Sequence, residues 1–220
     1  MGEYSLFEQI VDYFRNNGNQ YAEYLIQHLQ LSLTALLIGL LIGVPLGYVS
    51  YKHQKVAEFF ITSSQLLRII PSLAILFILI PIMGVGEMPA LVALVFLGIP
   101  PILINTILGF KEIPVVTKEV AVGLGMNTKQ LMKKIEFPLA IPFILNGIKL
   151  SLVEIIASAT LATYIGAGGL GTLIFTGLGL YRMDLLLIGG GTVTILSLLS
   201  MFILDIMIRK VSKNSVEFSS

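Results

Sequence analysis

The sequence predicts an all-α membrane protein, and its composition and apolar patterning both support that class. Of its 220 residues, 55% are hydrophobic and only 12% are charged, whereas soluble domains average about a quarter charged residues. A helix needs about 20 apolar residues to cross a bilayer. Such stretches occur at residues 29–51, 58–83, 88–110, 139–164 and 185–208. We therefore expect about five transmembrane helices.

The distribution of basic residues predicts the orientation of these spans. Ten of the fourteen Lys and Arg residues fall in the loop after the first span, in the central loop or in the C-terminal tail, while the opposite side holds only Arg15 and Arg182. Cytoplasmic loops carry an excess of Lys and Arg. We therefore expect a multi-pass protein of the cell (inner) membrane, with its N-terminus outside and its C-terminus in the cytoplasm.

Residues 1–24 are expected to form an external helix on the membrane surface. Phe7, Ile10, Val11 and Phe14 recur at helical spacing with acidic residues between them, a pattern typical of interfacial helices. A frayed tail is the alternative. Residues 25–211 then form the transmembrane domain, and residues 212–220 a cytoplasmic tail.

In the first span, Gly39, Gly43 and Gly47 recur every four residues. Small residues at this spacing allow another helix to approach closely, within the bundle or across a dimer.

The second span holds a charge, Arg68, well inside its apolar stretch. Charges at this depth normally face the protein interior or water. Gln65 shares a helical face with Arg68, and Ser72 continues it. These residues are candidates for a translocation path. In the third span Asn105 is another candidate, although an inter-helix hydrogen bond is an equal alternative.

The fourth span carries a small and polar stripe, Gly147, Ser151, Glu154 and Ser158. Glu154 and Arg68 are the ionisable residues deepest in two different spans, at similar depths. There are two interpretations. The two residues form a fixed ion pair that holds the two spans together, or they line the translocation path, where Arg68 faces a carboxylate of the substrate and Glu154 its cationic group.

The central loop, residues 117–138, is polar but has the signals of two short helices. Thr117 is expected to cap the first helix, and Gly125 to turn the chain after it. Asn127 and Gln130 form a capping-box pattern that starts the second helix, on which Leu131 and Ile135 share one face. Two short helices just outside a membrane are expected to form a projection, or docking knob, that fits a recess on a partner protein.

The loop also resembles a known motif. Glu119-Val120-Ala121, then Gly125, then Ile135, Phe137 and Pro138 resemble the EAA loop of binding-protein-dependent ABC importer permeases, with Val120 in place of the middle Ala and Phe137 in place of Leu. The resemblance implies a type I permease fold with cytoplasmic coupling helices. The residues that it implies for coupling to an ATPase are Glu119, Ala121, Gly125, Leu131, Ile135 and Pro138.

Three further segments resemble the permeases for glycine betaine, carnitine and choline: residues 70–74, 100–106 and 165–171. In the last segment Gly166, Gly168, Gly169 and Gly171 are expected to form a turn at an external gate. Arg68 and Glu154 depart from this subfamily, in which the matching positions are usually Gln and an uncharged residue.

The resemblance also implies partners: two cytoplasmic ATPase subunits that bind the ATP, an external substrate-binding protein, and a second permease chain, identical or paralogous. The chain itself has no G-x-x-x-x-G-K-[ST] phosphate loop, no Cys and only two His. We therefore expect no catalytic activity, cofactor or metal in this chain, and no nucleic-acid partner. The alternative is a stand-alone ion-coupled secondary transporter, which would account for Arg68 and Glu154 but has no use for a docking knob.

Overall fold

The computed structural model describes residues 5–217, with side chains to residue 212, and every regular element in this range is helical. The elements are α1 (Leu6–Tyr51), α2 (Gln54–Leu67), α3 (Ser72–Met83), α4 (Glu87–Lys111), α5 (Val115–Gly123), α6 (Thr128–Leu131), a π-helix (Met132–Glu136), α7 (Phe137–Ala159), a 3-10 helix (Leu161–Ile165), α8 (Gly171–Leu180) and α9 (Met183–Glu217). The all-α class is confirmed.

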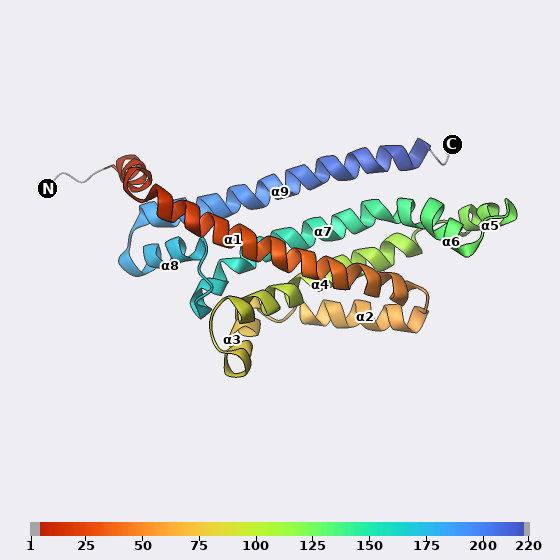
Figure 1. Cartoon of the computed structure of the whole chain (residues 1–220), viewed down its shortest axis with the longest axis horizontal. Coiled ribbons are helices and arrows are strands. Elements are labelled where there is room, and N and C mark those ends of the chain that lie inside the picture. The colour runs from red at the N-terminus through yellow and green to blue at the C-terminus, as the bar shows by residue number, and fades with distance from the viewer. Residues whose placement is uncertain (1–4, 218–220) are drawn as a thin grey trace.

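The long helices α1, α4, α7 and α9 run along the bundle, and each includes a stretch long and apolar enough to span a membrane. Helix α4 packs against both α1 and α7, and α9 packs along α7 (Figure 1). The largest buried cluster lies among α1, α4 and α7 and includes Leu94, Ile102 and Ile155. With α2 and α3 counted as one bent span, the described residues hold five, as predicted.

The glycine stripe of α1 packs inside the bundle. A methyl group built on Gly43 would lie 2.9 Å from the Ile102 side chain, and one on Gly47 would lie 2.7 Å from Thr106. Both contacts are on α4. The stripe therefore brings the backbones of α1 and α4 together, which settles the choice between packing within the bundle and packing across a dimer.

The second span is not one straight helix. Helices α2 and α3 meet at an angle of 93° across the break that contains Arg68 and Pro71. Pro71 has no N–H to continue the helical ladder, and its ring disfavours helical backbone at Ile70. The expectation that Ser72 continues the helical face of Gln65 and Arg68 is therefore wrong.

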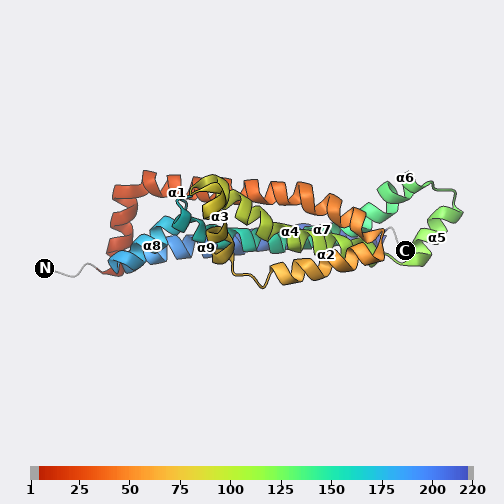
Figure 2. The same cartoon turned by 90° about the horizontal axis from the view of Figure 1, so that it is seen from below.

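The N-terminal segment is a helix that bends away from the first span. Ser5 and Glu8 form a capping box at its start, and Asn17 leaves helical backbone at φ −126° and ψ 20°. Figure 2 shows the segment before this bend turning away from the axis of the rest of α1, at the end of that helix. Tyr13 packs on Leu173 and Leu185, so residues from Leu6 onward are not a frayed tail. The bend lies at residue 17, before the predicted boundary at residue 24.

At the other terminus, α9 continues beyond the predicted span. The helix runs to Glu217, so most of the tail predicted at residues 212–220 is helical, and residues 218–220 lie outside the described range.

Candidate functional site: a projecting lobe and an internal polar face

Helices α5 and α6 and the π-helix, residues 115–136, form a lobe that extends beyond the end of the bundle (Figures 1 and 2). Its first helix begins earlier than predicted. Pro114 is the N-cap, with extended backbone at φ −56° and ψ 134°, and the Thr117 N–H already donates to the Pro114 carbonyl at 3.1 Å. Thr117 therefore lies inside α5. Proline favours the start of a helix, because it has no backbone N–H to leave unpaired there, and the prediction of Thr117 as the cap overlooked this.

The turn between α5 and α6 forms as its sequence predicts. Gly125 has φ +85°, the Met126 N–H donates to the Ala121 carbonyl at 3.1 Å, and the Gly125 N–H donates to the Val122 carbonyl at 2.9 Å. This pair of bonds is a Schellman motif, which ends a helix at a left-handed residue. The chain then enters α6 through the predicted capping box, in which Asn127 and Gln130 exchange two hydrogen bonds of 2.9 Å.

The π-helix joins the lobe to α7. In this segment the Phe137 N–H donates to the Met132 carbonyl, five residues back. Pro138 follows in the first turn of α7. Its ring would collide with the carbonyl of Lys134 in a regular α-helix, and the wider π turn gives that carbonyl room. The six predicted coupling residues thus lie along one continuous structure that ends at Pro138.

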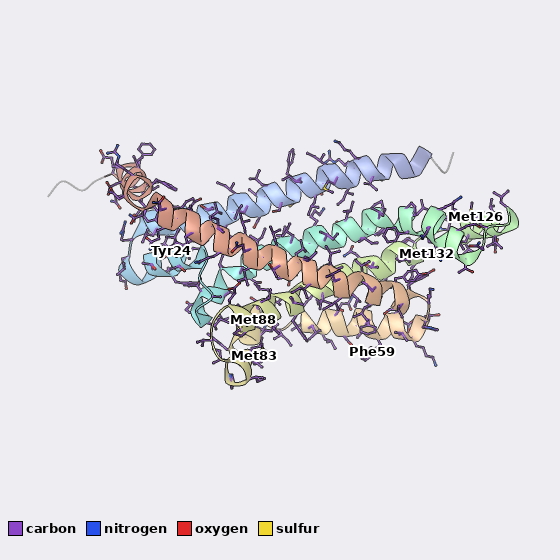
Figure 3. The ribbon with its side chains drawn as sticks, viewed as in Figure 1. Tyr24, Phe59, Met83, Met88, Met126 and Met132 are labelled. Atoms are coloured by element: carbon purple, nitrogen blue, oxygen red, sulfur yellow. The ribbon has the colours of Figure 1, made fainter. Side chains whose placement is uncertain are left out.

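The lobe exposes an apolar surface. Five of its side chains are between 55% and 76% exposed, namely Val115, Val116, Val120, Val122 and Leu124. Glu119 is exposed beside them, whereas Ala121 is buried, and Leu131 and Ile135 are half-buried with Met126 and Met132 (Figure 3). Exposed apolar patches of this kind mark interaction surfaces. The lobe has the form of a docking element.

Within the bundle, the structure brings Arg68 and Glu154 together. Their nearest side-chain atoms, Arg68 Nη2 and Glu154 Oε2, are 3.9 Å apart, although 86 residues of sequence separate them. The Arg68 side chain is 48% exposed and that of Glu154 is 26% exposed. Gln65 is also exposed, and Ser72 is half-buried. The pair is therefore loose and accessible from one side.

The other polar candidates point into helix contacts. Ser151 is fully buried, and its hydroxyl donates to the Gly98 carbonyl at 2.9 Å. The Asn105 amide donates to the Pro101 carbonyl at 2.8 Å, and its oxygen accepts from Asn146 at 3.0 Å. Ser158 is buried as well. Ser151 and Asn105 thus bridge α4 and α7. Ser151 and Ser158 are buried, whereas Arg68 and Gln65 are exposed and Glu154, Ser72 and Asn105 are half-buried.

The glycine-rich segment lies at the end of the bundle opposite the lobe and is a tight turn. Gly166, Gly168 and Gly169 all have φ between +74° and +82°, and Gly171 begins α8. The Gly169 N–H donates to Gln27 Oε1 at 3.1 Å. Beside this turn is a cavity of about 220 Å³, lined by Gln27, Gln30, Leu31, Glu87, Gly166, Ala167 and Gly168.

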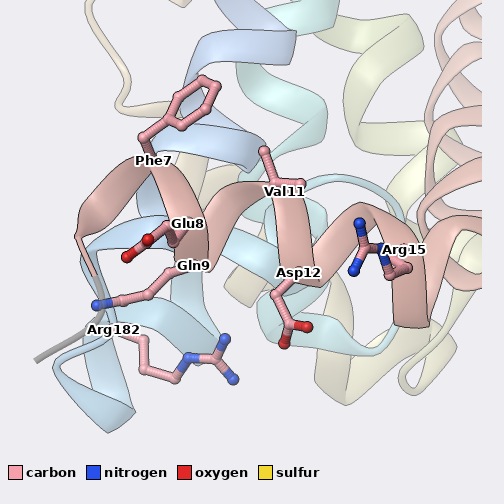
Figure 4. Close-up of a pocket in the computed structure, with 7 residues that line it drawn as sticks. All are labelled: Phe7, Glu8, Gln9, Val11, Asp12, Arg15 and Arg182. Carbon is pink, nitrogen blue, oxygen red and sulfur yellow. The ribbon is translucent and has the colours of Figure 1, made fainter. Parts of the chain in front are cut away.

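A larger cavity, of about 460 Å³, lies at the same end under the N-terminal helix (Figure 4). It is lined by Phe7, Glu8, Gln9, Val11, Asp12, Arg15 and Arg182. Asp184, fully buried at the start of α9, accepts hydrogen bonds from Arg182. This hydrogen bond raises the pKa of the Arg182 guanidinium. The Arg182 guanidinium in the cavity wall therefore stays protonated, and its charge is balanced by Asp184.

Two contacts were missed by reasoning from the sequence. Asp205 of α9 pairs with Lys149 of α7 at 2.7 Å. At the base of the lobe, Tyr51, Lys118 and Glu136 form a polar cluster. Both contacts join residues far apart in sequence, so no local spacing could have indicated them.

An apolar bundle with a broken span, an accessible charge pair and a projecting lobe with an exposed apolar surface is the arrangement expected of a membrane transport subunit. The chain belongs to the family of binding-protein-dependent transport system inner membrane components, whose model matches residues 35–213. The motif resemblance noted in the sequence is thereby confirmed.

Relatives of the chain bear the names of transport permeases for carnitine, glycine betaine and choline. The chain is 45% identical over 197 residues to the carnitine transport permease protein OpuCB of Listeria monocytogenes, covering 90% of both chains. It is 38% identical to the glycine betaine/carnitine/choline transport system permease protein OpuCB of Bacillus subtilis (strain 168), covering 95% of this chain and 96% of the relative. A structure of the MetNI methionine ABC transporter in an inward-facing conformation matches with a TM-score of 0.75 and 23% identity, over 87% of this chain and 95% of that one. It supports the type I permease fold.

Proposed function

We propose that this chain is the membrane permease of an ATP-driven importer for quaternary-ammonium osmoprotectants such as carnitine, glycine betaine or choline. The observation that carries the proposal is the projecting lobe with its exposed valines and Leu124, on a chain whose relatives bear the names of permeases for these solutes. The lobe docks into a cytoplasmic ATPase subunit, which binds and hydrolyses the ATP. An external binding protein delivers the solute.

The distribution of charge supports the proposed orientation. The lobe and the C-terminal end of α9 lie at one end of the bundle (Figure 1), and most Lys and Arg residues belong to the segments at that end. This end is cytoplasmic by the positive-inside rule. The N-terminal helix and the glycine-rich turn then lie outside, where a binding protein arrives.

A second permease chain completes the path. Arg68 is 48% exposed within an otherwise apolar part of the chain, and a charge at membrane depth does not face lipid. The face that holds Arg68 and Glu154 therefore lines a water-filled path between this chain and its partner. A zwitterionic solute offers a carboxylate for Arg68 and a cation for Glu154.

Transport by the reconstituted complex tests the proposal. The chain is placed in proteoliposomes with its co-encoded ATPase and binding protein, and uptake of labelled carnitine, glycine betaine, choline and amino acids is followed with and without ATP on the lobe side. We expect uptake of a quaternary amine only with ATP. Uptake that does not depend on ATP and stops when an ion gradient is dissipated would instead establish a secondary transporter.

We predict that the backbone shape at Gly125 is needed for coupling. A methyl group at either Gly123 or Gly125 meets no atom within 4 Å, but only Gly125 has a positive φ. Left-handed backbone costs a residue with a Cβ about 1–2 kcal/mol, so Gly125→Ala is expected to lower ATP-driven uptake by about tenfold. Gly123→Ala is the matched control and should transport normally. Equal uptake by the two variants would show that the turn is not required.

A further inference from the structure

The base of the lobe contains a buried carboxylate with two partners. The Glu136 side chain is only 9% exposed. Its Oε1 accepts a hydrogen bond from the Tyr51 hydroxyl at 2.9 Å and lies 3.4 Å from Lys118 Nζ. A carboxylate removed from water needs such partners to remain charged. Lys118 supplies an opposite charge, and the Tyr51 hydroxyl supplies a hydrogen bond.

The three residues of this cluster come from three different elements of the fold. Lys118 lies near the start of the lobe, in α5, and Glu136 is the last residue of the π-helix, where the lobe ends. Their ion pair therefore closes the lobe at its base. Tyr51, the last residue of α1, belongs to the bundle. Its hydroxyl connects the closed lobe to a membrane-spanning helix.

Aromatic contacts extend the connection to a second span. The Tyr51 ring stacks on Phe110 near the end of α4, with centroids 5.0 Å apart and an interplanar angle of 17°. Lys118 Nζ lies 5.4 Å from the centroid of the Tyr51 ring, within the range of a cation–π contact. Phe110 itself is almost fully buried. The lobe is thus joined through Tyr51 to the ends of both α1 and α4.

We propose that Tyr51, Lys118 and Glu136 are positioning residues that transmit movement of the lobe to α1 and α4. The inference rests on the proposed function, because it assigns the lobe's movement to a docked ATPase. When the ATPase shifts the lobe, the Glu136 carboxylate pulls on the Tyr51 hydroxyl, and the stacked ring carries the displacement to Phe110. The exposed apolar surface of the lobe binds the ATPase, and this cluster transmits the movement of the lobe to the bundle.

The test measures uptake and ATP hydrolysis together in proteoliposomes holding the full complex. Tyr51→Phe removes the hydroxyl and keeps the ring. We expect it to lower the amount of solute imported per ATP hydrolysed by about tenfold, since a hydrogen bond to a charged acceptor contributes that order to an equilibrium. Tyr48→Phe is the matched control. Tyr48 packs on the same Phe110, and the structure shows no hydrogen bond of its hydroxyl within the described residues.

Glu136→Gln is expected to lower the same ratio, and the double variant with Tyr51→Phe should be no worse than the poorer single variant, because both changes act on one bond. The ATPase should co-purify with every variant. An unchanged ratio in Tyr51→Phe would overturn the inference, and so would loss of the ATPase from the complex, which would make the cluster part of the docking surface. Absence of ATP-dependent uptake by the unmodified complex would overturn the proposed function itself.

Discussion

Arg68→Gln and Glu154→Gln are each expected to lose transport, and combining them is not expected to restore it. The pair is 3.9 Å apart with its side chains 48% and 26% exposed, so each charge keeps hydrogen-bonding capacity for a solute. A hydrogen bond to a charged group contributes about 1.5–3 kcal/mol. Losing one should lower uptake between about tenfold and a hundredfold, measured as the initial rate in proteoliposomes.

The double variant separates the two readings of this pair. If each single variant fails and the double variant recovers, the pair is a structural tie between the second and fourth spans. If all three transport at the unmodified rate, neither reading survives. Glu58→Gln is the control for removing an acid from α2, the helix that leads to Arg68. Glu58 accepts a hydrogen bond from Gln54 at 2.9 Å, is exposed near the start of α2, and should be replaceable without loss.

Gly171→Ala is expected to prevent correct folding. A methyl group at Gly171 would overlap the backbone carbonyl of Thr160 and the hydroxyl of Thr163. A carbonyl of the main chain cannot rotate away as a side chain can, so α8 would have to move from its place on α9. Overpacking of this kind costs about 3 kcal/mol or more. We expect a large loss of monodisperse protein after extraction in detergent, with a lower melting temperature for the remainder.

The matched control lies on the same helix. Gly179 has no atom within 4 Å of an added methyl group, and Gly179→Ala should therefore extract and melt like the unmodified protein. If Gly171→Ala matched it in yield and melting temperature, the tight contact at the start of α8 would not be a determinant of folding.

Local signals predicted the parts of this fold that depend on neighbouring residues. The Schellman turn at Gly125 and the capping box of Asn127 and Gln130 need only residues within one or two turns, and the sequence identifies both. The same holds for the apolar spans, whose length alone identifies them. The lobe could therefore be anticipated before its shape was known.

Contacts between distant segments were harder to anticipate. The predicted helical face ran through Pro71 to Ser72, whereas the chain turns by 93° between α2 and α3, an angle that depends on what α3 packs against. The buried orientation of Ser151 toward Gly98 depends on the rotation of α7 relative to α4. Lys149 pairs with Asp205 across two helices rather than along one. Each of these outcomes is set by tertiary packing, which helical periodicity does not specify.

The glycine contacts of α4 have a mechanical consequence. On one side α4 receives Gly43 and Gly47 of α1, and on the other it receives Gly147 of α7, where an added methyl group would lie 2.9 Å from the Pro101 carbonyl. These surfaces meet through main-chain atoms and the β-branched side chains of Ile102 and Thr106, and β-branched side chains have few rotamers to exchange in a helix. Sliding of one helix past another would need a concerted separation of backbones. We therefore expect α1, α4 and α7 to move as one rigid body. Bending of the chain is then expected at the break between α2 and α3.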